Sequence, residues 1–141
     1  GTHDLPPTLA FLRGDHIALR ARLGLLTRPV AEELAEDREW QEIVKDNLQA
    51  YGMLDNREDE NDVLVALHEY VAGTPSAFTV TNVVDMVGDV RAQNQPGTTK
   101  DQYPNWCIPL CNTAGEPVLL EELTQQELYQ RLARVSTRPG R

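Results

Sequence analysis

A histidine and an aspartate stand side by side near the start of the sequence, as His3 and Asp4, directly before a leucine and two prolines. A pair of this kind can bind a metal ion, hold the hydroxyl groups of a sugar or cap a helix. Taken alone, the pair favours the cap, with Asp4 ahead of a helix over residues 5–13 and His3 as a polar loop residue. A metal site would have to add Asp15 and His16, and it is the weaker hypothesis.

Two motifs in the second half of the sequence offer amide and aromatic groups to a ligand. Residues 94–99 are NQPGTT, a Pro-Gly turn that either reverses the chain or presents amide groups and bare backbone. Residues 103–106 are YPNW, whose rings can anchor a loop. Both motifs belong to an irregular stretch, residues 92–117, that contains four prolines. A loop of this length in a compact domain is usually functional or disordered, and its aromatic residues favour an ordered one.

Helices have to position these residues, and apolar side chains recur at helical spacing through most of the chain. The first helix is expected to stop at Gly14, and Asp15 is the expected N-cap of the next. Thr124 and Glu127 have the spacing of a capping box and predict the last helix. The predicted helices cover residues 8–13, 15–23, 29–51, 63–71, 83–87 and 124 onward.

One segment has the composition of a strand. Residues 76–82, SAFTVTN, are rich in β-branched and aromatic side chains, and Phe78 and Val80 alternate with polar residues. A second, weaker candidate is PVLL at residues 117–120. Because a lone strand cannot satisfy its own backbone, its neighbours are expected to lie outside the chain. The expected fold class is therefore mainly α-helical with one or two short strands.

Charge and hydropathy narrow the classes of partner. The net charge of −9 argues against a nucleic acid or an anionic membrane surface as the partner, whereas a neutral sugar is unaffected by it. No apolar run is long enough for a transmembrane helix, and no secretory signal is visible. Cys107 and Cys111 are expected to be reduced thiols of a cytoplasmic protein, since two thiols alone make a poor zinc site. No metal or cofactor is predicted.

Taken in order, these segments resemble the C-terminal part of the 4-α-glucanotransferases, the amylomaltases, and most of all their actinobacterial-type members. The resemblance extends from residue 2 to about residue 123. Its most specific element is the pair of motifs in the loop, and the THD triplet followed by Leu-Pro and a helix is the next. The matching stretches are THDLPPTLAFLRG at residues 2–14, GDHIALRARLGLL at 14–26, the lone strand, and NQPGTTKDQYPNW at 94–106.

The resemblance implies a fold and an activity. The family is built on a (β/α)₈ barrel and transfers α-1,4-glucan segments between maltooligosaccharides by a retaining mechanism, which needs two carboxylates about 5 Å apart. Residues 1–135 would be the C-terminal part of this catalytic barrel, with 76–82 as its eighth strand and 136–141 as a flexible tail. The chain of 141 residues is too short for a complete barrel of about 250 residues.

The resemblance also implies roles for individual residues. Asp4 would be a third carboxylate, at the end of the seventh barrel strand, that stabilises the transition state. His3 would contact the same sugar, and the loop with Asn94, Pro96 and Gly97 would line the substrate cleft. The chain departs from many relatives at Cys107, where they have an arginine.

The nucleophile and the acid/base of this family lie on earlier strands, upstream of Thr2, and no Asp or Glu of this chain occupies a matching motif. The chain alone is therefore expected to be inactive and, with unpartnered faces, to self-associate. The alternative is a non-catalytic helical interaction module that descends from this family. Such a module would bury its apolar helix faces within its own length.

Overall fold

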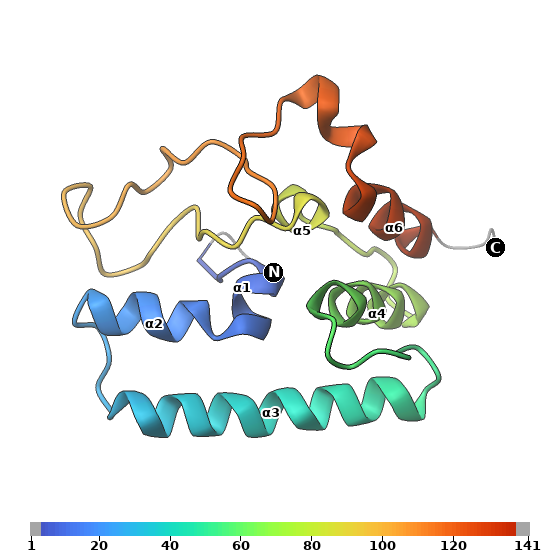
Figure 1. The fold of residues 1–141 in the computed structure, drawn as a ribbon, viewed down its shortest axis with the longest axis horizontal. Coiled ribbons are helices and arrows are strands. Elements are labelled where there is room, and N and C mark those ends of the chain that lie inside the picture. The colour runs from blue at the N-terminus through green and yellow to red at the C-terminus, as the bar shows by residue number, and fades with distance from the viewer. Residues whose placement is uncertain (1–3, 138–141) are drawn as a thin grey trace.

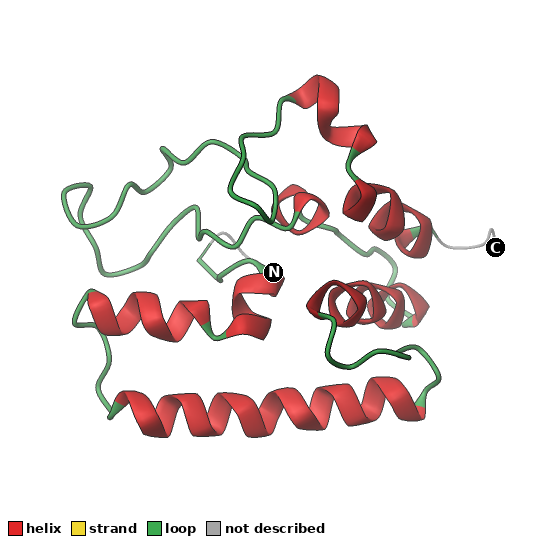
Figure 2. Ribbon diagram, viewed as in Figure 1, coloured by secondary structure: helices red, strands yellow, loops and turns green. Residues whose placement is uncertain are grey.

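The structure, a computed structural model, describes residues 4–137 and consists of helices and loops (Figure 2). His3 and residues 138–141, which include most of the predicted tail, lie outside the described residues. The prediction of a mainly helical chain is confirmed. Within residues 4–137, no helix is long and apolar enough to cross a membrane.

The helices lie in three layers across the view of Figure 1, with the middle layer in contact with both others. The first layer is α3 (Val30–Ala50), the second holds α1 (Thr8–Arg13), α2 (Asp15–Arg22) and α4 (Glu60–Gly73), and the third holds α5 (Val83–Val87) and α6 (Glu127–Ser136). A 3₁₀ helix, η1 (Leu120–Gln125), precedes α6. The loop over residues 92–117 extends beyond α5 on the side where α2 lies (Figure 1).

Helix starts follow local hydrogen bonding, and the starts of α4 and α6 differ from their predictions. α4 begins inside the acidic run of residues 55–62, because the Asp59 carboxylate accepts hydrogen bonds from the backbone N–H of Asn61 at 2.8 Å and of Asp62 at 3.1 Å. The capping box predicted for Thr124 and Glu127 is wrong. Thr124 lies within η1, and α6 begins after Gln126. The 3₁₀ helix that contains Thr124 was not predicted from the sequence.

The strand predicted over residues 76–82 does not form. These residues have no ladder partner among residues 4–137, and the side chains of Phe78 and Val80 are 88% and 82% exposed. The second candidate, residues 117–120, contributes a single isolated bridge between Pro117 and Cys111. A strand exists only through hydrogen bonds to a neighbour, so strand composition without a neighbour leaves an irregular, mostly exposed segment.

The hydrophobic core lies where α1, α3, α4 and α6 meet. It is formed by Leu12, Leu48, Leu54, Val63, Leu64, Ala66, Leu128 and Leu132. The apolar face predicted for α3 is only partly covered, because Leu48 is buried while Trp40, Ile43 and Tyr51 are 45%, 54% and 62% exposed. The core therefore uses one end of α3 and leaves much of its apolar stripe in solvent.

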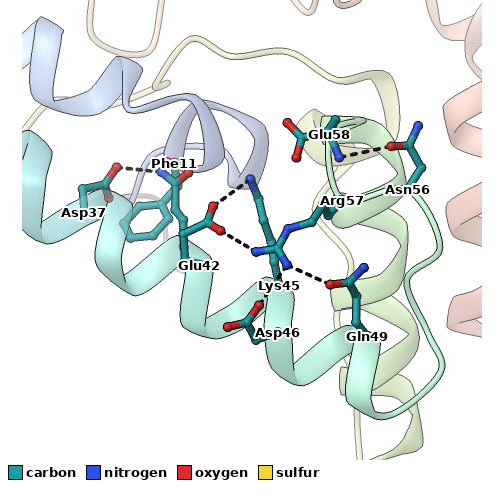
Figure 3. Close-up of polar contacts among 10 residues, drawn as sticks. Phe11, Asp37, Glu42, Lys45, Asp46, Gln49, Asn56, Arg57 and Glu58 are labelled. Carbon is teal, nitrogen blue, oxygen red and sulfur yellow. Dashed lines mark hydrogen bonds and ion pairs between the residues drawn. The ribbon is translucent and has the colours of Figure 1, made fainter.

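An arginine in the loop before α4 fixes that loop against α3 (Figure 3). Arg57 Nη1 donates to Asp46 Oδ1 and to Gln49 Oε1, each at 2.9 Å, and its Nη2 pairs with Glu42. These acceptors lie on successive turns of one helix face, so a single guanidinium spans them. The hydrogen bond to Asp46 raises the pKa of Arg57, which stays charged.

The packing predicts which leucines stabilise the fold. Leu132→Ala removes a side chain that is fully buried between α6 and α4, and we expect it to lower the free energy of unfolding by about 2–5 kcal/mol. Leu120→Ala is the matched control, because that side chain is 82% exposed, and it should change stability by less than about 0.5 kcal/mol. Urea denaturation followed by circular dichroism measures both. Equal effects of the two substitutions would contradict this assignment of the core.

Candidate functional site at the start of helix α1

A cleft of about 550 Å³ opens between the start of α1, α2 and the segment that follows α5. Its walls include Asp4 and Pro6 from the loop before α1, His16 and Arg20 from α2, and residues 94–96. Three of the residues singled out by the sequence, Asp4, Asn94 and Pro96, therefore line one cleft, although Asp4 and Asn94 are 90 positions apart in the chain.

A direct hydrogen bond joins two of these residues. The side-chain amide of Asn94 donates to Asp4 Oδ1 at 2.7 Å, across 90 positions of sequence. Asn94 was expected to contact a ligand, and in the structure its amide is engaged with the aspartate. The bond holds one carboxylate oxygen of Asp4 in a fixed direction at the mouth of the cleft.

The turn after Asn94 needs a glycine. Gly97 has a φ of +83°, in the left-handed region that residues with a side chain disfavour. There is room for a side chain, because a Cβ at this position would lie 3.7 Å from Leu25 Cδ2. The hydroxyl of Thr98 closes the turn by donating to the carbonyl of Gln95 at 2.7 Å. Gly97 thus shapes the backbone beside the cleft, and its neighbour Pro96 faces the cleft.

In the long loop, hydrogen bonds from side chains to the backbone hold the chain in place of regular secondary structure. Asn105 Oδ1 accepts from the backbone N–H of Gln95 at 2.7 Å, and its Nδ2 donates to Thr98 Oγ1 at 2.9 Å. The backbone N–H of Trp106 donates to the carbonyl of Gln93 at 2.8 Å. These bonds join the NQPGTT and YPNW motifs into one structural unit. The asparagine of YPNW is the residue that holds NQPGTT in shape.

The aromatic residues of this loop divide into one anchor and one exposed ring. The Tyr103 side chain is buried, and its hydroxyl donates to the carbonyl of Ala92 at 2.6 Å. Burial raises the pKa of this phenol above its ordinary value of 10. Trp106 is 61% exposed and has a φ of +62°. Cys107 is exposed as well.

An ion pair between the buried Asp89 and the partly exposed Arg91, which was not predicted from the sequence, connects the start of the loop with residues 109–111. Asp89 is 1% exposed and accepts from the backbone N–H and Nε of Arg91, and from the N–H of Cys111 at 2.9 Å. Arg91 Nη2 also donates to the carbonyl of Pro109 at 2.6 Å. The hydrogen bond to Asp89 raises the pKa of Arg91. A charged pair two positions apart directly after Gly88 was the available signal.

A second buried carboxylate, also missed, holds the start of α1. Asp85 of α5 is 3% exposed, and its two oxygens accept from the backbone N–H of Thr8 at 2.7 Å and from the Thr8 hydroxyl at 2.9 Å. His68 Nε2 of α4 lies 3.7 Å from Asp85 Oδ2. The residue that caps α1 therefore comes from α5, and the cap predicted for Asp4 does not form: Pro7 precedes the helix without a side-chain cap.

The described residues do not form the geometry that the hypothesis of a metal site requires. His16 stacks on Phe11, with ring centroids 4.6 Å apart, and its Nε2 lies 3.8 Å from Asp37 Oδ1. Among residues 4–137, no group of three or more His, Cys, Asp and Glu side chains is arranged to hold a metal ion.

The loop anchor predicts a pH dependence. A phenol with a raised pKa in the folded state stabilises the fold below pH 10, and this contribution is lost as the pH rises above 10, because the unfolded chain ionises first. We expect Tyr103→Phe to cost about 1 kcal/mol at pH 8, through the lost bond to Ala92. The difference from the parent chain should shrink by pH 11. Denaturation at both pH values measures it.

The control for this measurement is Tyr51→Phe, because the Tyr51 side chain is 62% exposed. This variant should follow the parent chain at both pH values. A Tyr103→Phe chain whose stability difference from the parent is the same at pH 8 and pH 11 would contradict the raised pKa.

Comparison with known proteins places the chain in a family. A family model described as 4-alpha-glucanotransferase (Glyco_hydro_77) matches residues 1–113. The 4-alpha-glucanotransferases of Mycobacterium tuberculosis and Mycobacterium bovis are each 47% identical over 124 residues, which is 86% of this chain and 17% of each relative. The chain thus spans about a sixth of the length of these relatives.

A solved structure agrees with this placement. The crystal structure of amylomaltase from Corynebacterium glutamicum matches with a TM-score of 0.90 and 50% sequence identity, over 97% of this chain and 21% of that one. The resemblance inferred from the sequence is therefore confirmed. Since the family model matches well over half of its length, the chain belongs to the 4-alpha-glucanotransferase family.

Proposed function

We propose that this chain is a segment of a retaining 4-alpha-glucanotransferase that transfers α-1,4-glucan segments between maltooligosaccharides. The observation that most directly supports the proposal is the contact between Asp4 and Asn94 at 2.7 Å, at the mouth of a cleft. The two residues belong to the two motifs that most resemble the family. Family membership and the likeness to an amylomaltase support the same conclusion.

In the proposed mechanism Asp4 stabilises the transition state. Glycosyl transfer with retention passes through an oxocarbenium-like state, in which a nearby carboxylate binds the sugar hydroxyls and offsets the positive charge. The Asn94 amide fixes the direction of the Asp4 carboxylate before substrate arrives. Pro96 and the turn at Gly97 form the adjoining wall, and His3 contacts the same sugar as Asp4. The nucleophile and the acid/base come from parts of the enzyme outside this chain.

We propose further that residues 1–135 are the C-terminal part of the catalytic barrel. The exposed side chains of Phe78 and Val80 support a fold that is completed by other residues. The alternative, a self-sufficient helical module, would bury its apolar faces, whereas Trp40, Ile43 and Tyr51 are exposed. The cytoplasmic location expected from the sequence stays a prediction.

The role of Asp4 is tested in a complete enzyme. The matching segment of the Mycobacterium tuberculosis 4-alpha-glucanotransferase is replaced by this chain, and the hybrid enzyme is incubated with maltotriose. We expect released glucose and longer oligosaccharides, and we expect Asp4→Asn to lower kcat by at least about 10²-fold, because it removes a charge that acts on the transition state. Asp55→Asn is the control, because Asp55 is an exposed aspartate in the loop between α3 and α4.

An inactive hybrid, or an Asp4→Asn hybrid as active as the parent, would contradict the proposed function. The 141-residue chain alone is included in the same assay, and it should release no glucose above background. Turnover by the chain alone would contradict the proposal that its nucleophile and acid/base lie elsewhere.

The exposed apolar segment predicts the behaviour of the chain by itself. We expect it to self-associate, because the apolar residues Phe78 and Val80 are almost fully exposed, in a segment to which the structure assigns neither helix nor strand. Light scattering should show species larger than the monomer, and Phe78→Ser with Val80→Ser should reduce them. Leu120→Ser is the control, because Leu120 is as exposed as Val80 but lies in η1. A monodisperse monomer of the parent chain would contradict the prediction.

A further inference from the structure

We propose that Asp85 is a positioning residue for Asp4: it fixes the start of α1 and, through it, the loop that presents the Asp4 carboxylate to the cleft. This inference rests on the proposed function, because it assigns a role to Asp85 through Asp4. Asp85 lies outside the cleft that Asp4 and Asn94 line, so it acts without touching substrate there.

The first step is the bond between α5 and α1. Asp85 is 3% exposed, and it accepts two hydrogen bonds from one residue, Thr8, at 2.7 and 2.9 Å. Thr8 is the first residue of α1, and its N–H has no acceptor within the helix. A pair of bonds to the same residue fixes its direction as well as its position. The start of α1 is therefore defined by a carboxylate that is 77 positions away in sequence.

The second step leads from Thr8 to Asp4. Only Leu5, Pro6 and Pro7 separate the two residues, and each proline ring fixes its own backbone φ. The carbonyl of Pro7 accepts the N–H of Phe11 at 3.0 Å, so the tether is tied to the first turn of α1. A short, stiff tether passes a displacement of Thr8 on to Asp4.

The third step is that the same segment of chain also holds Asp4 from the other side. α5 passes through Gly88 into residues 89–94, and Asn94 at the end of this stretch donates to Asp4 at 2.7 Å. Asp85 and Asn94 therefore fix the aspartate from two directions. A side chain at Gly88 is disfavoured, because its φ is +74° and a Cβ there would lie 2.4 Å from Thr113 Cγ2, which would have to shift. The spacing between the two supports is thus set by close packing.

The variants are made in the hybrid enzyme described above. We expect Asp85→Ala to lower kcat by about 10²-fold with KM changed by less than about threefold, because misplacing a group by 1 Å costs about that much in rate. Asp85→Asn should recover most of the rate. Its carbonyl can accept the Thr8 N–H and its amide can donate to the Thr8 hydroxyl. Thr8→Val, which keeps the backbone bond and loses the hydroxyl bond, should fall between the two.

The matched control is Asp62→Asn. Asp62 pairs with Arg131 and so also joins two helices, α4 and α6, but it lies away from the cleft. Asp62→Asn should lower the melting temperature and leave kcat unchanged. Thermal melting of every variant identifies any that does not fold. If Asp85→Ala is one of these, Asp85→Asn and Thr8→Val give the comparison.

A double-mutant cycle with Asp4→Asn separates positioning from general stabilisation. If Asp85 acts through Asp4, Asp85→Ala causes no further loss of kcat in the Asp4→Asn background. An equal loss in both backgrounds would overturn the inference, as would an Asp85→Ala enzyme with unchanged kcat. Neither result touches the proposed function, which fails only if Asp4→Asn itself leaves kcat unchanged or the hybrid is inactive.

Discussion

Two buried carboxylates, Asp85 and Asp89, lie on either side of Gly88 and hold α1 and the long loop to α5. Asp85 binds the start of α1, and Asp89 binds Arg91 and the backbone at Cys111. Burying a carboxylate is costly unless several donors surround it, and each of these two receives at least two hydrogen bonds. Because the donors come from distant parts of the chain, satisfying the carboxylates fixes helix α1 and the long loop relative to α5.

The hydrophobic core depends on the packing of apolar side chains alone. Leucines and valines of α4 and α6 fill the space between those helices, and Leu12 and Leu48 complete the core from α1 and α3. The remaining apolar stripe of α3 and residues 76–82 stay in solvent.

The cleft adjoins α1, which contributes Leu12 to the core and bonds to Asp85 through Thr8. α1 packs on α4 through its apolar side and, through the loop before it, places Asp4 at the opening. The long loop has no ladder or helix to order it, and side chains such as Asn105 and Tyr103 bond its backbone instead. This explains why the motif residues of the loop are polar or aromatic. The two motifs that carry the sequence resemblance meet at the hydrogen bond between Asn94 and Asp4.

The sequence by itself determined the helices of the first half, the glycine that ends α1 and the family, because helical spacing, turn residues and motifs are local properties. Only the tertiary structure decided what is contacted across long separations. In the folded chain the Asn94 amide bonds to Asp4, and Asp85 accepts the N–H at the start of α1. Asp89 accepts the N–H of Cys111 from the far part of the loop. The tertiary structure also left residues 76–82 without a ladder and absorbed Thr124 into η1. Composition states what a residue can bond with, whereas the partner it receives depends on which segments the packing brings together.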